Sequence, residues 1–135
     1  MFRYAVIVKG SLEIRVRYGE CDPMGVAHHT VYPVWFEMGR TELLRETGRS
    51  YRCMEEEGAF LAVVRLQLNY RRPARYDDLL RMETTLASVG SVKIDHTYEL
   101  FRGDELLCVG STTLACLDSS GKAQALPEGM FAVKV

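Results

Sequence analysis

One stretch near the N-terminus, residues 18–32, contains the residue types from which a site for acyl transfer could be built. It holds Asp22 in an Asp-Pro-x-Gly sequence, then His28 and His29, and it leads directly into an apolar segment. A carboxylate can activate water or attack a carbonyl itself. The unpaired N–H groups at the start of a helix can stabilise a carbonyl oxygen that gains negative charge. A plainer interpretation is also open, because aspartates in such sequences commonly serve to form the turn.

Two other chemistries fit the same stretch less well. His28, His29 and Asp22 could suggest a metal site, but adjacent side chains tend to diverge and no HxxxH or HExxH spacing is present, so we expect no metal. Cys21 could suggest a thiolate nucleophile, but a neighbouring carboxylate would raise its pKa and disfavour the thiolate. The four cysteines form no CxxC pair, which favours reduced, structural thiols in a cytoplasmic protein.

The segment after the turn has the pattern of a long helix, from about Thr30 to Thr47, with Gly48 as its end. Apolar residues occupy more than half of its circumference, which is typical of a buried helix. We expect Glu37 and Arg40 to lie on the polar side. The expected buried face, with its flanking residues, consists of Val31, Val34, Trp35, Met38, Tyr32, Phe36 and Leu43. A second short helix over residues 50–57 is a weaker prediction.

Five other segments have the apolar pattern of strands: residues 12–17, 62–70, 80–86, 92–100 and 106–117. The last of these is apolar on both faces, which predicts a central strand or one covered by a partner. Short turns join the last three, so these strands must be antiparallel. His96 falls on an apolar strand face and is interpreted as a core or interface histidine. We predict one α+β domain over residues 1–135, with an antiparallel five- or six-stranded sheet wrapped around the helix.

The composition narrows the possible partners. The chain is 47% hydrophobic and 26% charged with a net charge of -1, so no overall basic field would attract nucleic acid. No apolar run approaches the roughly 20 residues that cross a bilayer, and the N-terminal residues do not resemble a signal peptide. The open edges of the predicted sheet make self-association an expectation.

Two motifs resemble a known family. The run RYGECDPMGVAHHTVYPVWFEMGRTELLRETG resembles the opening of the 4-hydroxybenzoyl-CoA thioesterase and YbgC-like family of hotdog-fold thioesterases. The second, RRPARYDDLLRMETTL, resembles the family's later Pro and Tyr-Asp-Asp signature. The resemblance covers nearly the whole chain, from Leu12 to about Leu126. The positions that match the family's first motif are Asp22, Gly25, Val26, His29, Tyr32, Phe36, Glu37 and Arg40.

The resemblance implies a hotdog fold and hydrolysis of an acyl-CoA thioester to a free acid and CoA. No cofactor is implied, since coenzyme A is part of the substrate. It also implies dimers or dimers of dimers (a homotetramer) with active sites at the subunit interface. Asp22 would be general base or nucleophile, and the backbone N–H of His29 would polarise the thioester carbonyl. The implied substrate contacts are Gly25, Val26, His28, Tyr32 and Glu37. The candidates for binding the CoA phosphates are Arg72, Arg75 and Lys93, which otherwise form a solvated charged rim.

Three alternative functions stay open. They are a thioesterase acting on acyl-carrier-protein esters, a hydratase or dehydratase on the same fold, and a non-catalytic module that binds acyl-CoA. The hydratases use a His with a helical carboxylate in a different motif. A pure binder needs no carboxylate beside the thioester, so Asp22 and His29 together favour the hydrolase.

Overall fold

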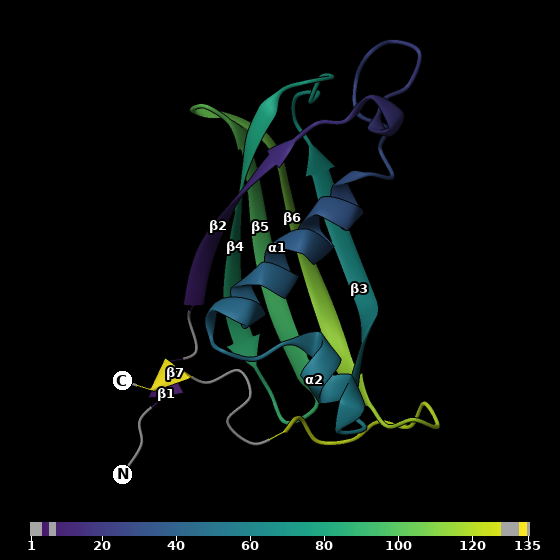
Figure 1. The fold of residues 1–135 in the computed structure, drawn as a ribbon, viewed down its shortest axis with the longest axis vertical. Helices are drawn as coiled ribbons and strands as arrows, with labels where there is room; N and C mark the ends of the chain where they lie inside the picture. The colour runs from purple at the N-terminus through teal and green to yellow at the C-terminus, as the bar shows by residue number, and fades with distance from the viewer. Residues whose placement is uncertain (1–3, 6–7, 128–132, 135) are drawn as a thin grey trace.

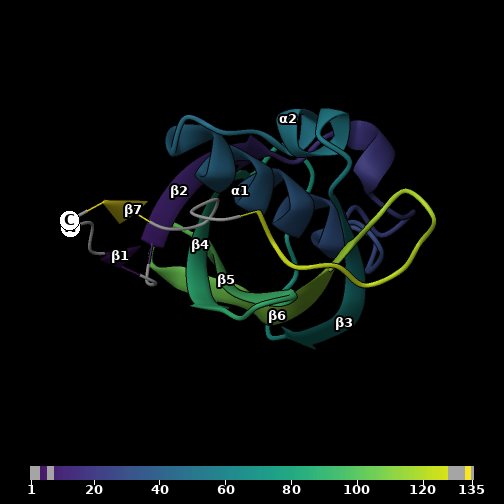
Figure 2. The same ribbon diagram turned by 90° about the horizontal axis from the view of Figure 1, so that it is seen from below.

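The structure is a computed structural model that describes residues 4–5, 8–127 and 133–134. Its main element is a five-stranded antiparallel sheet in the order β2-β4-β5-β6-β3. The strands are β2 (Val8–Arg15), β3 (Phe60–Tyr70), β4 (Leu79–Val89), β5 (Lys93–Arg102) and β6 (Glu105–Leu117). The sheet curves around one long helix, α1 (Tyr32–Glu46), as Figures 1 and 2 show. This is the α+β architecture that the sequence predicted.

The remaining elements are short. A 3-10 turn, η1 (Tyr18–Glu20), follows β2, and α2 (Tyr51–Glu56) follows α1, where the sequence predicted a second helix. A separate two-stranded ladder pairs β1 (Tyr4–Ala5) with β7 (Val133–Lys134). None of the described helices has the length and apolar character needed to cross a bilayer.

Strands β4 and β5 confirm the predicted alternation. Their inner faces supply much of the core through Leu80, Met82, Ile94, Tyr98 and Leu100, each at most 1% exposed. β6 lies between β5 and β3, an interior position that agrees with the prediction of a central strand. His96 is also buried, as the sequence predicted for a core histidine.

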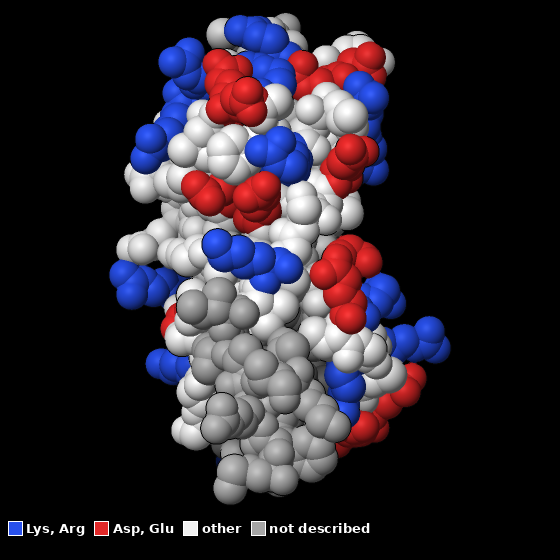
Figure 3. All heavy atoms as spheres, turned by 90° about the vertical axis from the view of Figure 1, so that its left-hand side faces the viewer, with Lys and Arg blue, Asp and Glu red and all other residues white. Residues whose placement is uncertain are grey.

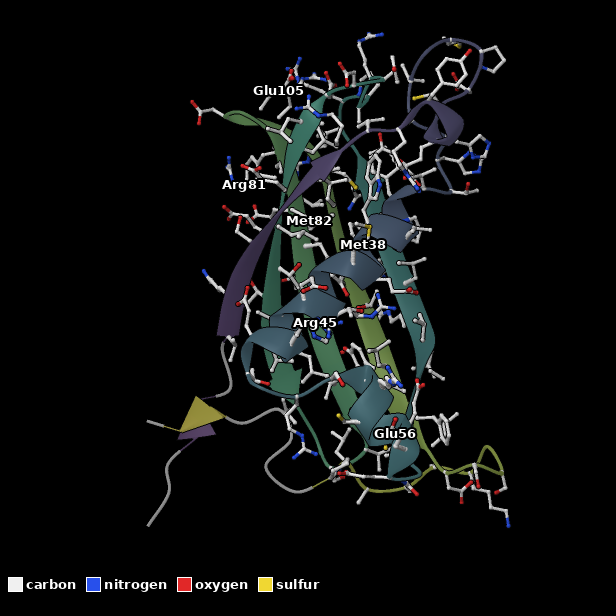
Figure 4. All side chains as sticks on the ribbon, in the orientation of Figure 1. Met38, Arg45, Glu56, Arg81, Met82 and Glu105 are labelled. Atoms are coloured by element: carbon white, nitrogen blue, oxygen red, sulfur yellow. The ribbon has the colours of Figure 1, made fainter. Side chains whose placement is uncertain are left out.

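The predicted buried face of α1 is partly wrong. Val34 and Met38 are 50% and 41% exposed, whereas Arg40, expected on the polar side, is only 8% exposed. The reason is Gly39, which faces β4: a Cβ added there would lie 2.3 Å from Thr84 Oγ1. The helix approaches the sheet along its smallest residue, and this rotates Met38 toward the outside (Figure 4).

β3 also departs from simple alternation. The register with β6 shifts between Val63 and Arg65, so Val64 is the extra residue of a β-bulge. Beyond the bulge the two faces exchange, and Val63 rather than Val64 shares the inner face with Leu66. Simple alternation over residues 62–70 would instead place Val64 and Leu66 on one face.

The two edges of the sheet differ in character. Along β2 the exposed side chains include Lys9, Glu13 and Arg15, and charges of both signs are interspersed on this side of the molecule (Figure 3). Charged side chains protect an edge strand against pairing with another chain. β3, at the other edge, instead exposes Val63, Val64 and Leu66, which are 49%, 54% and 43% exposed.

Candidate active site

The Asp22 turn is held as a small hairpin between η1 and α1. Backbone hydrogen bonds join the amide of His28 to the carbonyl of Glu20 at 2.8 Å, and the amide of Asp22 to the carbonyl of Val26 at 2.9 Å. Gly25 closes the tip with φ +79°, a conformation in which glycine carries no steric cost. Its carbonyl accepts the amide of Tyr76 at 3.1 Å, which ties the hairpin to the segment before β4.

Within this hairpin, Asp22 forms the turn and still keeps one carboxylate oxygen available. Its Oδ1 accepts the amide N–H of Met24 at 2.8 Å, as the turn-forming interpretation predicted. Within the described residues, Oδ2 has no hydrogen-bond partner. The side chain is partly exposed, so water can reach it. The turn role and a catalytic role are therefore compatible.

A buried carboxylate fixes the hairpin to the helix. Glu20 is 8% exposed and accepts the indole N–H of Trp35 at 3.1 Å and the backbone N–H of Arg17 at 2.8 Å. Burial by itself raises the pKa of Glu20, but the hydrogen bonds from Arg17 and Trp35 outweigh it and hold the pKa below its usual value. Apart from its position two residues before Asp22, no sequence pattern indicates a role for Glu20.

His29 lies three residues before the start of α1, in the turn that leads into the helix. The hydroxyl of Tyr70 donates to the His29 carbonyl at 2.7 Å. Within the described part of the chain, the amide N–H of His29 has no acceptor. The positive end of the helix dipole follows directly, so this amide is placed to receive an oxygen that gains charge.

A hollow of about 280 Å³ opens beside His29. Tyr32 lines it, as expected of a substrate contact, and its ring packs edge-on against Tyr70 at 5.0 Å. The Tyr32 hydroxyl accepts the amide of Ala74 at 3.2 Å. Asp22 does not line the hollow, but Ala27 does. Asp22 lies close to Ala27 in the hairpin, because its amide donates to the carbonyl of Val26, the residue before Ala27.

The basic residues near this hollow are only partly those predicted. Arg72 lines it and forms an ion pair with Glu105 at 3.4 Å, and Arg71, absent from the predicted set, lines it as well. Arg75 pairs through its backbone with Val26 in the Asp22 hairpin. Lys93 lies far from this hollow. It pairs with Ala115 on β6, whereas Tyr70 pairs with Cys108, and these two partners are seven residues, or roughly 23 Å, apart along β6.

The other predicted contacts are also dispersed. His28 is exposed, and its Nδ1 lies 2.8 Å from the hydroxyl of Thr30, so it stabilises the turn before α1. Glu37 lines a second hollow further along the helix. Burial, with the charges of Glu20 and Asp22, raises the pKa of the Cys21 thiol, which agrees with a structural role. In the described residues no three His, Cys, Asp or Glu side chains gather as a metal-binding group.

Four residues of the hollow lie outside the predicted set of site residues: Ala27, Tyr70, Arg71 and Pro73. The sequence pattern marked Tyr70 only as the last residue of a strand, and Pro73 only as a turn residue and a part of the family's second motif. The contact between Tyr70 and His29 joins positions 41 residues apart, and no local pattern carries such a signal.

Comparison with known proteins agrees with this architecture. A family model described as the thioesterase superfamily matches residues 24–109, which begin two positions after Asp22. The acyl-CoA thioester hydrolase YbgC of Escherichia coli is 30% identical, over 88% of this chain and 90% of its own. The acyl-CoA thioesterase YbgC of Haemophilus influenzae is 34% identical, over 80% of each chain.

A solved structure gives the same result at the level of the fold. The DHNA-CoA thioesterase of Staphylococcus aureus superposes with a TM-score of 0.85 at 32% identity, covering 87% of this chain and 80% of that one. The sheet wrapped around α1, the family match over most of the chain and these relatives together show that the protein belongs to the thioesterase superfamily of hotdog-fold thioester hydrolases.

Proposed function

We propose that this protein hydrolyses acyl-CoA thioesters to a free acid and CoA, with Asp22 as the catalytic carboxylate. The observation that carries the proposal is the presence of two unsatisfied groups within one hairpin and its following turn. Within the described residues, the Asp22 Oδ2 has no partner, and the His29 amide is a free donor beside a solvent-open hollow. The relatives named as acyl-CoA thioester hydrolases support the choice of substrate.

In the proposed reaction, the thioester carbonyl lies at the His29 amide, which stabilises the negative charge that develops on its oxygen. Asp22 takes the proton of a water molecule that attacks the carbonyl carbon, or attacks that carbon itself to form an anhydride that water then opens. The C–S bond breaks and the CoA thiolate leaves. Water and these groups complete the reaction, and we propose that no metal or redox cofactor takes part.

Arg71 and Arg72 at the rim of the hollow, with Arg75 beside the Asp22 hairpin, are proposed to bind the phosphates of CoA. Guanidinium groups form charge-assisted, often bidentate hydrogen bonds with phosphate. Lys93 is too far along the sheet to join them within one chain. Carrier-protein esters remain the alternative substrate, because their phosphopantetheine arm presents the same thioester without the nucleotide.

We further propose that the active form is a dimer or a dimer of dimers. The exposed apolar residues of β3 lie on an edge strand whose outer backbone groups pair with none of the described residues, and a second copy could cover both features. Light scattering should give a mass of two or four times 15.3 kDa. A mass near 15.3 kDa at micromolar concentration would remove the interface from the proposal.

The experiment that tests the function is a panel of acyl-CoA esters assayed with a thiol-trapping dye. Thioester hydrolysis should release CoA from at least one member, and the truncated pantetheine esters should show a higher KM, with the difference reduced by salt. An equal KM for CoA and pantetheine esters would transfer the proposal to carrier-protein substrates. No release from any ester would favour the non-catalytic binding module.

A further inference from the structure

The connection between β3 and β4, residues 71–78, contacts both parts of the candidate site. Its first residues line the hollow beside His29: Arg71, Arg72 and Pro73. Its middle holds the start of α1, because the amide of Ala74 donates to the Tyr32 hydroxyl at 3.2 Å. It also holds the Asp22 hairpin, since the Ala74 carbonyl accepts the amide of Ala27 at 2.8 Å. The 71–78 segment therefore sets where the hairpin lies relative to the hollow.

This segment has a backbone conformation that its own sequence does not favour. Asp77 has φ +69°, and it is the one residue other than glycine with a positive φ in the described part of the chain. A left-handed backbone is unfavourable for a residue with a Cβ, although aspartate tolerates it better than most. Such a conformation persists where contacts with the surrounding structure hold it.

Arg102, the last residue of β5, supplies contacts to both ends of the segment. Its Nη1 donates to the carbonyl of Pro73 at 3.2 Å and to Oδ2 of Asp78 at 2.6 Å. The same Asp78 oxygen accepts the amide of Arg75 at 2.8 Å, and Arg75 forms a β-bridge with the Asp22 hairpin. A continuous chain of contacts therefore leads from this guanidinium to the hairpin, although Arg102 itself does not line the hollow.

Glu105 orients the other side of the guanidinium. Its Oε1 accepts the Nε–H of Arg102 at 3.1 Å and also accepts from Nη2. The two residues flank the turn between β5 and β6, so the sheet itself fixes the direction of the fork (Figure 4). A guanidinium holds its donors in one plane at fixed angles, whereas a lysine ammonium is a single point charge. The three acceptors around Arg102 therefore require an arginine.

We propose that Arg102 is a positioning residue: acting through Asp78, it holds the 71–78 segment so that the Asp22 hairpin stays in place beside the hollow. The proposal rests on the function proposed above and adds a residue to its machinery. A displacement of about 1 Å in a reacting group can lower a rate by about 10²-fold, because orientation supplies much of the rate. Loss of Arg102 should therefore slow the chemical step and leave substrate binding largely intact.

The test measures kcat and KM of Arg102→Met with the acyl-CoA that the wild type hydrolyses fastest and with the matching pantetheine ester. For both esters kcat should fall about tenfold or more, while both KM values stay within about threefold of wild type. Asp78 and Glu105 are 22% and 36% exposed, so water can solvate them in this variant and the chain should fold. Arg102→Lys keeps a charge beside Asp78 without the fork and should lose less kcat.

Arg81→Met is the matched control. Arg81 also contacts the turn between β5 and β6, through the Gly103 carbonyl at 3.2 Å, and it pairs with Glu83 at 2.9 Å (Figure 4). Its side chain is 40% exposed against 30% for Arg102, but these partners lie outside the 71–78 segment. This variant should leave kcat and KM of both esters unchanged. A kcat loss equal to that of Arg102→Met would attribute the effect to any change at this turn and overturn the proposal.

Hydrogen exchange separates local positioning from a general loss of stability. The reporters are the amides of Ala27 and Tyr76, which join the hairpin to the 71–78 segment. In Arg102→Met both should exchange about tenfold or more faster, whereas amides in the middle of β5 keep their wild-type rates. Equal acceleration throughout the chain would mean that Arg102 only stabilises the fold. Unchanged rates at both reporters would mean that the segment does not depend on it, and either result overturns the proposal.

Two kinetic results would also overturn it. The first is a kcat of folded Arg102→Met within about threefold of wild type. The second is a rise in KM confined to the CoA ester, which would mean that Arg102 binds a phosphate of CoA directly.

Asp78→Asn serves if Arg102→Met does not fold. It keeps an acceptor for the Arg75 amide but removes the charge that holds Arg102, so kcat should fall by several-fold for both esters. Adding Asp78→Asn to Arg102→Met or to Arg102→Lys should lower kcat little further, because residues that act as one unit are not additive. Losses that multiply, or a wild-type kcat in Asp78→Asn, contradict the role of Asp78.

The two measurements distinguish this proposal from the hydrolase itself. If the wild type hydrolyses no ester, but Ala27 and Tyr76 exchange faster in Arg102→Met, the anchoring of the hairpin stands and the proposed reaction fails. If esters are hydrolysed and Arg102→Met keeps its kcat, the reaction stands and the positioning role is overturned.

Discussion

Substitution of Asp22 separates its two roles in the hairpin. Asp22→Asn retains an Oδ1 acceptor for the Met24 amide at 2.8 Å, so the turn should persist. It removes the negative charge on the free Oδ2, and with it both the base and the nucleophile. Asp22→Ala removes the turn hydrogen bond as well. The pair of variants therefore asks whether Asp22 serves structure alone, catalysis alone, or both.

The magnitudes follow from these contacts. Loss of a general base costs about 10²–10⁴ in rate, or about 3–5 kcal/mol of barrier, and both variants should lose that much kcat. The stabilities should differ. Asp22→Asn should unfold within about 0.5 kcal/mol of wild type, as a surface change that keeps its hydrogen bond. Asp22→Ala should lose about 1 kcal/mol, the net contribution of one hydrogen bond.

The assay is acyl-CoA hydrolysis under saturating substrate, accompanied by urea unfolding and light scattering of each variant. Activity of Asp22→Asn within a few-fold of wild type would refute a catalytic role and leave the turn as the sole function of this residue. Single-turnover hydrolysis in ¹⁸O-water then distinguishes the two mechanisms. Label in the Asp22 carboxylate indicates an anhydride, and its absence favours a general base.

Three further outcomes are expected. Burial, with the nearby charge of Arg40, lowers the pKa of His96 from 6.5 to about 4. Because the unfolded chain then binds more protons than the folded one below pH 6.5, the free energy of unfolding should fall by about 2 kcal/mol between pH 7 and pH 5. His96→Leu should flatten that slope, and an unchanged slope contradicts the assignment. Gly39→Ala should lower the free energy of unfolding in urea by about 1–3 kcal/mol, because the added Cβ clashes with Thr84. Gly19→Ala, which has open space around its Cβ, should lower it far less. Equal losses of stability would count against close packing of α1 on β4. Glu20→Gln should lower the free energy of unfolding at pH 7 by about 1–2 kcal/mol and change the fluorescence emission of Trp35, the single tryptophan. If stability and emission both stay at their wild-type values, the contact between Glu20 and Trp35 does not anchor the hairpin.

The sequence by itself determined the features that depend on neighbours along the chain. The alternation over 80–86 and 92–100 predicted β4 and β5, and the doubly apolar run predicted that β6 is an interior strand. The Asp-Pro-x-Gly sequence predicted the turn, because side-chain and backbone geometry within four residues is enough to form it. The match of spaced residues to a thioesterase motif is confirmed at the level of the family.

Only the tertiary structure decided which surfaces meet. The rotation of α1 depends on the close approach of Gly39 to β4, which leaves the apolar side chains of Val34 and Met38 exposed. The face of β3 depends on a bulge that exists only in its pairing with β6. The burial of Arg40 and the contact of Tyr70 with His29 join elements far apart in sequence. Each of these is set by how two elements pack, and the periodicity of either one contains no information about the other.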